Sequence, residues 1–289
     1  MRIEEIGDGI YMVDVMPFGF EKLISCYILD SERRVVVETG PRSSIKTVFN
    51  ALDELGIKKL DYIFISHIHL DHAGGAGTLA NEFGGKIVCH ARGAKHVVNP
   101  EKLWKASVEF SEVNRLYGKP DSVSESHIIK IDEDVEFSIG NIKIKAIKTE
   151  GHAAHHLSFF AEKERILFSG DSAGMCLNKA VIPTTPSPFN FDEWKKSVER
   201  MILLKPEKIA YTHFGMYEAD ELLESVLLMA ERWVRTAENS SSVEEFLEKA
   251  KKEDNDLRRF MELYSYCDVM LRWIDYGFEG MYEYLKGKE

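Results

Sequence analysis

Two stretches of this 289-residue chain each pass from a strand pattern to a helix pattern, and this repetition constrains the fold more than any other feature. In the first stretch, short apolar runs and apolar–polar alternation predict strands over residues 2–16, 22–30, 33–37, 61–66 and 86–90. Apolar residues at helical spacing predict a helix over 43–55, and another helix is expected to start near Gly74.

The second stretch repeats this order between residues 128 and 213. Strands are predicted over 128–131, 135–139, 142–147, 157–162, 165–170 and 208–213, with a helix over 192–203. Gly140-Asn141 is typical of the turn between two of these strands. Because each stretch joins strands to helices, we expect an α/β protein in which two sheets pack face to face and helices cover their outer faces.

The last part of the chain, residues 217–289, shows helical spacing of apolar residues only. Serines 240–242 followed by Glu245 are typical of a helix start, because a serine there can cap the first turn. We therefore expect one domain over 1–216 and a helical C-terminal extension over 217–289, which acts as a lid or as an oligomer contact.

The composition, 44% hydrophobic and 29% charged, is that of a globular protein. No apolar run of about 18 residues and no secretion signal appear, so we expect a cytoplasmic protein without a membrane span. A net charge of −11 without a Lys/Arg-rich run disfavours nucleic acid as a partner. The four cysteines are far apart, which predicts buried free thiols. Glutamine is absent, and Lys and Glu are abundant, as is typical of a thermophile.

The strongest chemical signal is the segment SHIHLDH, residues 66–72, at the end of the strand predicted over 61–66. Four side chains able to bind a metal, His67, His69, Asp71 and His72, occur there within six residues. Two histidines separated by one residue project to the same side of an extended chain. Small residues follow, which lets the backbone pass close to a crowded site. This pattern predicts a metal site.

Three further candidate ligands, His152, Asp171 and His213, each follow a predicted strand. The carboxyl ends of strands are where α/β proteins gather their functional groups. Imidazole nitrogens and carboxylate oxygens suit Zn²⁺, Fe²⁺ or Mn²⁺. We expect zinc first, with iron and manganese as the alternatives.

The motif HIHLDH, followed by Gly151-His152, Gly170-Asp171 and Thr212-His213, resembles the metallo-β-lactamase superfamily, and within it the glyoxalase II-like and lactonase-like branch. The resemblance covers residues 1–215, which makes 1–216 a metallo-β-lactamase-like catalytic domain. It implies an αββα sandwich with a cleft that holds two metal ions. It also implies that one ion is held by His67, His69 and His152, the other by Asp71, His72 and His213, and that Asp171 bridges both.

A water shared by two cations is expected to lose its proton near neutral pH, since a zinc-bound water has a pKa of about 7. The hydroxide would then attack a carbonyl or phosphoryl group that the ions polarise. Asp71 is the predicted catalytic residue, which accepts the hydroxide's hydrogen bond and passes a proton to the leaving group.

Other residues near these motifs have two interpretations each. Glu38 stands where relatives usually have an aspartate, and either orients a ligand histidine or serves as a turn residue. His155 replaces the relatives' usual glycine, and either contacts substrate or packs. Phe18 and Phe20 lie in a loop that overhangs the cleft in this superfamily, and form either a substrate wall or part of the core. Phe214 is a weaker candidate of the same kind.

The leading hypothesis is a metallo-hydrolase that cleaves the acyl bond of a small-molecule lactone, thioester or ester, with promiscuity left open. The acidic helical tail, whose clearest basic pair is Arg258-Arg259, speaks against glutathione thioesters, which glyoxalase II grips with basic residues. The second hypothesis is phosphodiester or phosphotriester hydrolysis, because two metals suit displacement at phosphorus. The third is a sulfur dioxygenase-like oxidoreductase with one iron, which a metal count would distinguish.

Overall fold

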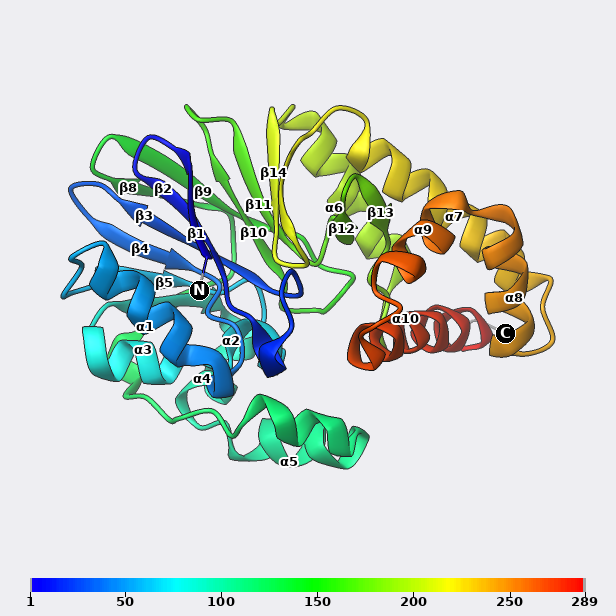
Figure 1. Cartoon of the computed structure of the whole chain (residues 1–289), viewed down its shortest axis with the longest axis horizontal. Coiled ribbons are helices and arrows are strands. Elements are labelled where there is room, and N and C mark those ends of the chain that lie inside the picture. The colour runs from blue at the N-terminus through cyan, green and yellow to red at the C-terminus, as the bar shows by residue number, and fades with distance from the viewer. Residues whose placement is uncertain (1, 288–289) are drawn as a thin grey trace.

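The computed structural model describes residues 2–287 and shows an αββα sandwich with a helical C-terminal region (Figure 1). The first sheet runs in chain order through β1 (Arg2–Gly7), β2 (Ile10–Asp14), β3 (Ser25–Asp30), β4 (Arg34–Val37), β5 (Tyr62–Phe64), β6 (Lys86–His90) and β7 (Ile128–Ile131). Strands β1 to β4 are antiparallel, and β4 to β7 are parallel. The helices that follow β4, β5 and β6 are α1 (Ile45–Glu54), α2 (Leu70–Ala73), α3 (Ala76–Phe83) and α4 (Ala91–Val98).

The second sheet has the strand order β15-β14-β11-β10-β9-β8. Its strands are β8 (Val135–Ile139), β9 (Ile142–Lys148), β10 (Leu157–Ala161), β11 (Ile166–Gly170), β14 (Lys208–Tyr211) and β15 (Gly215–Glu218). Only β11 and β14 pair in parallel. Helix α6 (Phe191–Leu203) lies between them in the sequence and leads directly into β14. A small hairpin of β12 (Met175–Leu177) and β13 (Ala180–Ile182) lies between β11 and α6 in sequence.

Most of the predicted elements are confirmed, and the differences have local causes. The strand predicted over 2–16 is wrong as a single element, because a turn at Asp8-Gly9 folds it into the β1–β2 hairpin, with Gly9 at φ 68°. Strand β7 was predicted as part of the second half, but it pairs with β6 in the first sheet. Strand β15 was predicted as the start of the helical part, and the 216/217 boundary falls inside it.

Successive side chains of a strand point to opposite faces of the sheet, and those on the inner faces form the core between the two sheets. Val35 and Val37 face the second sheet, whereas Val36 between them joins the cluster formed with the outer helices. The rings of Phe64 on β5 and Phe159 on β10 stack across the interface with centroids 4.9 Å apart. Full burial of a side chain of this kind stabilises the fold by about 1.5–3 kcal/mol. The two sheets are thereby held face to face, with several strand ends at one edge.

Four helices form the C-terminal region: α7 (Leu222–Glu238), α8 (Val243–Glu253), α9 (Asn255–Leu263) and α10 (Asp268–Lys286). Helix α8 begins after Ser242, whose hydroxyl accepts a hydrogen bond from the Glu245 amide, as predicted. The rings of Trp233, Phe246 and Phe278 pack together between these helices. Helices α7 and α9 lie against β13, so the tail packs on the sandwich.

Two further observations bear on the sequence-based expectations. All four cysteines are buried free thiols, as predicted. Among residues 2–287, no helix has both the length and the apolar character needed to cross a membrane.

Candidate metal centre

Seven predicted metal-binding side chains converge where strands of both sheets end. The loop after β5 and the short helix α2 carry four of them, and the chain leaving β9, β11 and β14 supplies the rest: His67, His69, Asp71, His72, His152, Asp171 and His213. The parallel pairing of β11 with β14 brings the strand ends before Asp171 and His213 to the same edge of the second sheet. The sites predicted from separate motifs therefore form one cluster.

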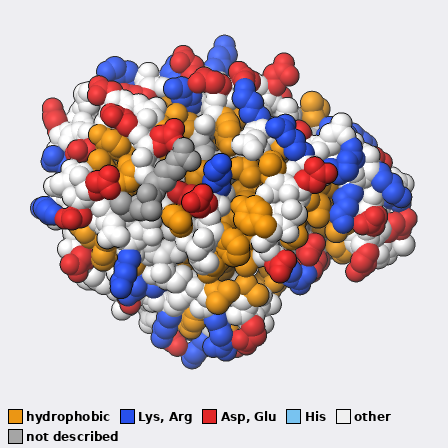
Figure 2. Space-filling model, viewed as in Figure 1, with side chains coloured by type: hydrophobic (Ala, Val, Ile, Leu, Met, Phe, Trp, Pro, Cys, Tyr) orange, Lys and Arg blue, Asp and Glu red, His pale blue; other side chains and the backbone are white. Residues whose placement is uncertain are grey.

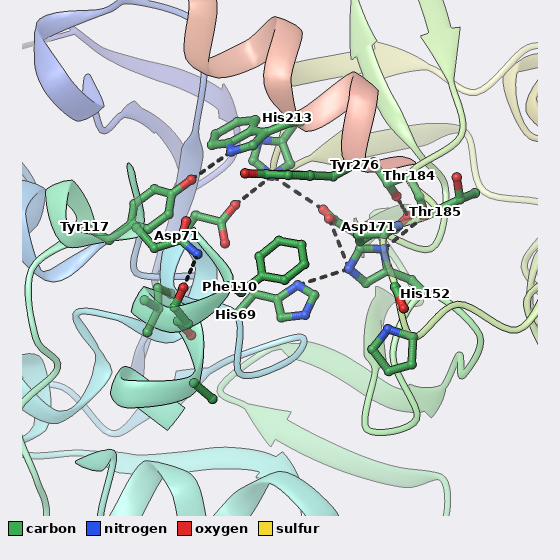
Figure 3. Close-up of a pocket in the computed structure, with 18 of the residues that line it drawn as sticks. His69, Asp71, Phe110, Tyr117, His152, Asp171, Thr184, Thr185, His213 and Tyr276 are labelled. Carbon is green, nitrogen blue, oxygen red and sulfur yellow. Dashed lines mark hydrogen bonds and ion pairs between the residues drawn. The ribbon is translucent and has the colours of Figure 1, made fainter. Parts of the chain in front are cut away.

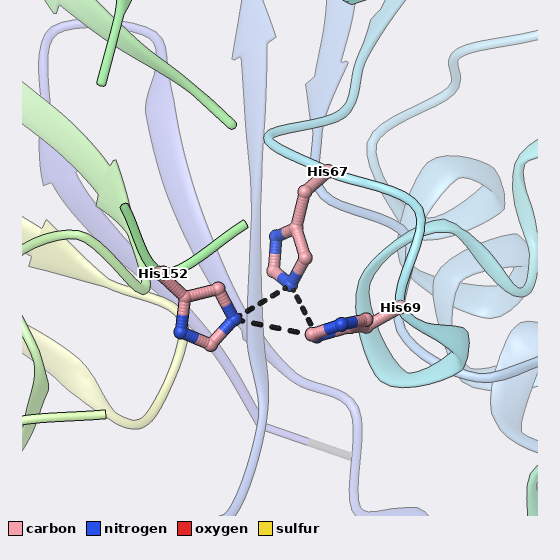
Figure 4. A group of neighbouring side chains, drawn as sticks. All are labelled: His67, His69 and His152. Atoms are coloured by element: carbon pink, nitrogen blue, oxygen red, sulfur yellow. Dashed lines mark hydrogen bonds between the residues drawn. The ribbon is translucent and has the colours of Figure 1, made fainter. Parts of the chain in front are cut away.

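Three histidines of this cluster point their ring nitrogens at one another (Figure 4). His67 Nε2 lies 2.8 Å from His69 Nδ1, and His152 Nε2 lies 3.2 Å and 3.3 Å from these two atoms. His67 and His152 are buried, and His69 is half-buried. Three nitrogens this close are held together best by a cation, because neutral imidazole has only one ring hydrogen to share.

Hydrogen bonds outside the cluster show which nitrogen faces inward. Three histidines each donate an Nδ1 hydrogen to an oxygen of a residue far away in the sequence: His72 to Glu38 Oε2 (3.1 Å), His152 to the Thr184 carbonyl (3.1 Å) and His213 to the Leu23 carbonyl (2.9 Å). Once the ring is neutral, as metal binding requires, the Nε2 atom keeps its lone pair and turns it into the site. Such outer partners are typical of metal-ligating histidines.

A second group contains Asp71, His72 and His213, whose ligand atoms lie within 4.8 Å of one another. Asp171 lies between the two groups, with Oδ2 3.4 Å from His152 Nε2 and Oδ1 3.3 Å from His72 Nε2. Asp171 Oδ1 is buried and has no hydrogen-bond partner. A buried carboxylate oxygen without a donor is costly unless a cation faces it.

The pKa values in the three-histidine group shift downward. Burial, with repulsion from His72, His69 and His152, holds the pKa of His67 well below its usual range. Burial and the neighbouring His152 lower the pKa of His69 to about 3. These rings are therefore neutral at pH 7, which is the form that binds a metal.

In the second group, attraction between carboxylates and imidazoles shifts the pKa values in the opposite direction to burial. Burial lowers the pKa of His72, but Asp171, Asp71 and Glu38 together raise it well above its usual range. Burial raises the pKa of Asp71, but His72 and His213 outweigh it and lower the value to about 2. Negative oxygens thus stand beside convergent imidazoles. The donor set and the unpaired Asp171 oxygen fit a divalent metal site.

Two buried residues support the ligands from outside. Glu38 accepts hydrogen bonds from the Ser66 amide at 2.9 Å and from His72, so it touches the segment that carries the motif. His156 Nε2 accepts from the Asp171 amide at 3.0 Å, and its Nδ1 lies 3.0 Å from the Ser172 hydroxyl. In sequence, His156 was notable only as a neighbour of His152 in the segment GHAAHH, residues 151–156.

Gly170 explains how Asp171 reaches the cluster. Its backbone has φ 54°, and a Cβ there would lie 2.6 Å from His156 Nε2 and 2.6 Å from Ser66 Cβ. Only glycine therefore allows β11 to end this close to the motif.

A cavity of about 360 Å³ opens above the cluster (Figure 3). Its floor contains His69, Asp71, His152, Asp171 and His213. Its walls come from three segments: α5 (Glu101–Phe110) with the following short helix η3 (Glu112–Tyr117), the loop over residues 184–188, and α10. No helix was predicted over the residues of α5, and α10 was expected only as part of a C-terminal extension that serves as a lid or as an oligomer contact.

The four candidate substrate contacts lie elsewhere. Phe18 packs on Tyr117 with centroids 5.4 Å apart, and Phe20 on Tyr266 at 6.1 Å, both outside the cavity lining. Phe214 is buried in the core between the sheets. His155 is half-buried, with its ring 6.2 Å from that of His67, and it does not line the cavity either.

Comparison with known proteins gives the family. A family model for the metallo-beta-lactamase superfamily matches residues 20–213. The metallo-beta-lactamase fold-containing protein ST1585 of Sulfurisphaera tokodaii is 30% identical over 214 residues, 72% of this chain and 79% of that protein. Its crystal structure superimposes with a TM-score of 0.69, at 28% identity, over 77% of this chain and 86% of that one.

Two other matches extend the comparison. The metallo-beta-lactamase family protein TTHA1429 of Thermus thermophilus has the same fold at a TM-score of 0.68 and 19% identity, over 98% of this chain and 95% of that one. A hydroxyacylglutathione hydrolase of Brucella ovis is 27% identical over 157 residues, 52% of this chain, and the match spans about half (51%) of that relative's length. With the sandwich and the histidine–aspartate cluster, these matches show that the chain belongs to the metallo-beta-lactamase superfamily.

Proposed function

We propose that this protein holds two divalent metal ions, zinc in the first place, and hydrolyses the acyl bond of a lactone, thioester or ester. In this proposal His67, His69 and His152 would hold one ion, Asp71, His72 and His213 would hold the other, and Asp171 would be shared by both. The observation that carries it is the set of inward-facing nitrogens around Asp171 Oδ1, a buried oxygen without a hydrogen-bond partner. Among the described residues, three side-chain groups have metal-ligand geometry, and two of them coincide with these two triads.

Bound ions would supply Lewis-acid chemistry and a water of lowered pKa. The protein's own part is to bind and orient them. Each carboxylate oxygen of Asp171 lies beside a different triad, which favours a bridging role. Hydrogen bonds from His72, His152 and His213 to fixed oxygens hold those rings in the ligating orientation.

Asp71 is the proposed proton carrier. Its carboxylate lines the cavity, and its Oδ2 lies 3.5 Å from His213 Nε2. The lowered pKa, about 2, keeps the group charged at neutral pH, so it can accept a hydrogen bond. A carboxylate in this position can accept a proton and give it to the leaving group.

The acyl assignment draws on the relatives and on the cavity. Among the curated relatives is a hydroxyacylglutathione hydrolase, whose name states an acyl substrate. The residues lining the described cavity include no lysine or arginine that would pair with phosphate oxygens. A phosphotriester, which carries no charge, is therefore the stronger of the two phosphorus alternatives.

The test is a hydrolysis panel on protein of known metal content, comparing a lactone, a thioester, a phosphodiester and a phosphotriester by proton release. We expect turnover of the lactone or the thioester, and its loss after metal removal by a chelator. Turnover of phosphorus esters alone would contradict the proposal. Failure of every substrate with two ions bound would contradict it as well.

A further inference from the structure

We infer that the cavity above the metal centre takes an uncharged acyl substrate whose apolar group lies between α5 and α10, which makes the last helix of the chain part of the substrate site. This inference rests on the proposed acyl hydrolysis and specifies its substrate class. It also gives the C-terminal helices a functional role, because none of the metal-binding motifs lies in them.

The charges around the cavity are the first observation. Asp71 and Asp171, both on the floor, are the only carboxylates of the described lining, and no lysine or arginine accompanies them. Arg272 of α10 lies outside the lining, with its guanidinium 4.5 Å from the centroid of the Tyr276 ring and 3.5 Å from Asp275 Oδ2. A substrate tail with a carboxylate would lose water here and gain no cation in return, which is costly.

The walls are the second observation. Helix α5 contributes Leu103, Ala106 and Phe110, and α10 contributes Trp273 and Tyr276. The rings of Phe110 and Tyr276 are tilted by 54° to each other, with centroids 4.9 Å apart. Figure 3 shows both side chains at the pocket. Phe110 is nevertheless 58% exposed. An aromatic ring left exposed at the wall of a cavity offers apolar area that a ligand can cover.

The attachment of α10 to the centre is the third observation. Trp273 Nε1 donates a hydrogen bond to the Tyr117 hydroxyl at 2.8 Å, which joins α10 to η3. The indole of Trp273 also lies edge-on to the His213 imidazole, with centroids 4.9 Å apart. The last helix therefore touches a proposed metal ligand and the opposite wall with one side chain.

The third wall is fixed to the same helix. The Thr185 hydroxyl donates a hydrogen bond to the Gly277 carbonyl, and Thr184 donates to the Asp171 carbonyl. A Cβ at Gly280 would lie 2.2 Å from the Thr185 carbonyl oxygen, so the loop and α10 are in direct contact. Figure 2 shows hydrophobic side chains gathered where the sandwich meets the C-terminal helices. The cavity is thus a built site with mainly apolar walls.

The experiment uses the metal-loaded full-length protein and 4-nitrophenyl esters of acetate, butyrate, hexanoate and octanoate. We expect kcat/KM to rise by up to about fourfold per added methylene, the value of one buried CH₂. A 4-nitrophenyl ester of equal length that ends in a carboxylate should lose this gain. The chain-length preference should fall in Phe110→Ala and persist in Leu116→Ala. Leu116 is a matched control, because it is 52% exposed on η3 and lies outside the lining.

A binding measurement separates this inference from the proposed chemistry. Octanamide, an uncharged probe, should quench tryptophan fluorescence in the parent and Leu116→Ala proteins and bind at least tenfold more weakly to Phe110→Ala. Binding with this pattern but no ester turnover would refute acyl hydrolysis and keep the apolar subsite. Ester turnover that is equal for neutral and carboxylate-ended chains, or unaffected by Phe110→Ala, would overturn the subsite and keep the hydrolase.

Discussion

The Glu38→Gln substitution tests how the protein prepares its histidines for metal. The Glu38 carboxylate is 2% exposed, and its two oxygens accept from the Ser66 amide and from His72 Nδ1. Glutamine has the same shape but only one oxygen, so one of these two donors must face an NH₂ group. If His72 moves its hydrogen to Nε2 to accept from that group, it loses the lone pair that points into the site. If it does not, a buried donor goes unpaired, at a cost of about 1–3 kcal/mol.

Either outcome weakens metal binding, and loss of such an outer partner typically costs about 10–100-fold in affinity. The assay is competition with a chelator of known affinity, followed by metal analysis, with circular dichroism to verify the fold. Glu150→Gln is the matched control, because Glu150 Oε1 lies 3.5 Å from Nε2 of His90, a histidine outside the proposed ligand set. Metal affinity within twofold of the parent in Glu38→Gln, or an equal loss in both variants, would show that Glu38 does not prepare His72 for metal.

Asp71→Asn should keep at least one bound metal and lower kcat by about 100-fold or more, the scale of general acid–base catalysis; an unchanged kcat would exclude Asp71 as the proton carrier. The pKa of His69 is about 3 in the folded protein and 6.5 by its usual value, so its contribution to stability is present above pH 6.5 and is lost as the pH falls. Metal-free protein should therefore lose about 2 kcal/mol from this group between pH 7.5 and pH 5, measured by urea unfolding; this loss should vanish in His69→Asn and remain in His127→Asn. Phe278→Ala should destabilise the protein by about 3–5 kcal/mol, because its ring packs on Trp233 and Phe246; a loss below 1 kcal/mol in thermal or urea unfolding would contradict that packing.

The cluster could be predicted because its signals are local. SHIHLDH is contiguous, and His152, Asp171 and His213 each stand at the end of a recognisable strand. Parallel strands bring such ends to one edge, so sequence position alone implies spatial proximity. The β1–β2 turn also had a local signal, Asp8-Gly9, which a long alternating pattern concealed.

The cavity walls could not be predicted in the same way. Tyr117 and Trp273 are 156 residues apart in sequence, and their hydrogen bond depends on how the tail packs against the sandwich. Phe18 and Phe110 are equally apolar in sequence, yet Phe18 packs on Tyr117 while Phe110 lines the cavity. Tertiary packing decides which aromatic residue faces a substrate, and no periodicity along the chain records it.

The most direct test of the account is a metal titration followed by activity. Metal-free protein would receive zinc in steps, with bound metal counted per chain and turnover of a neutral lactone or ester measured at each step. We predict that two ions bind per chain and that turnover develops fully only as the second site fills. A single bound iron that supports oxidation of a sulfur substrate, with no acyl hydrolysis in the zinc form, would contradict the account.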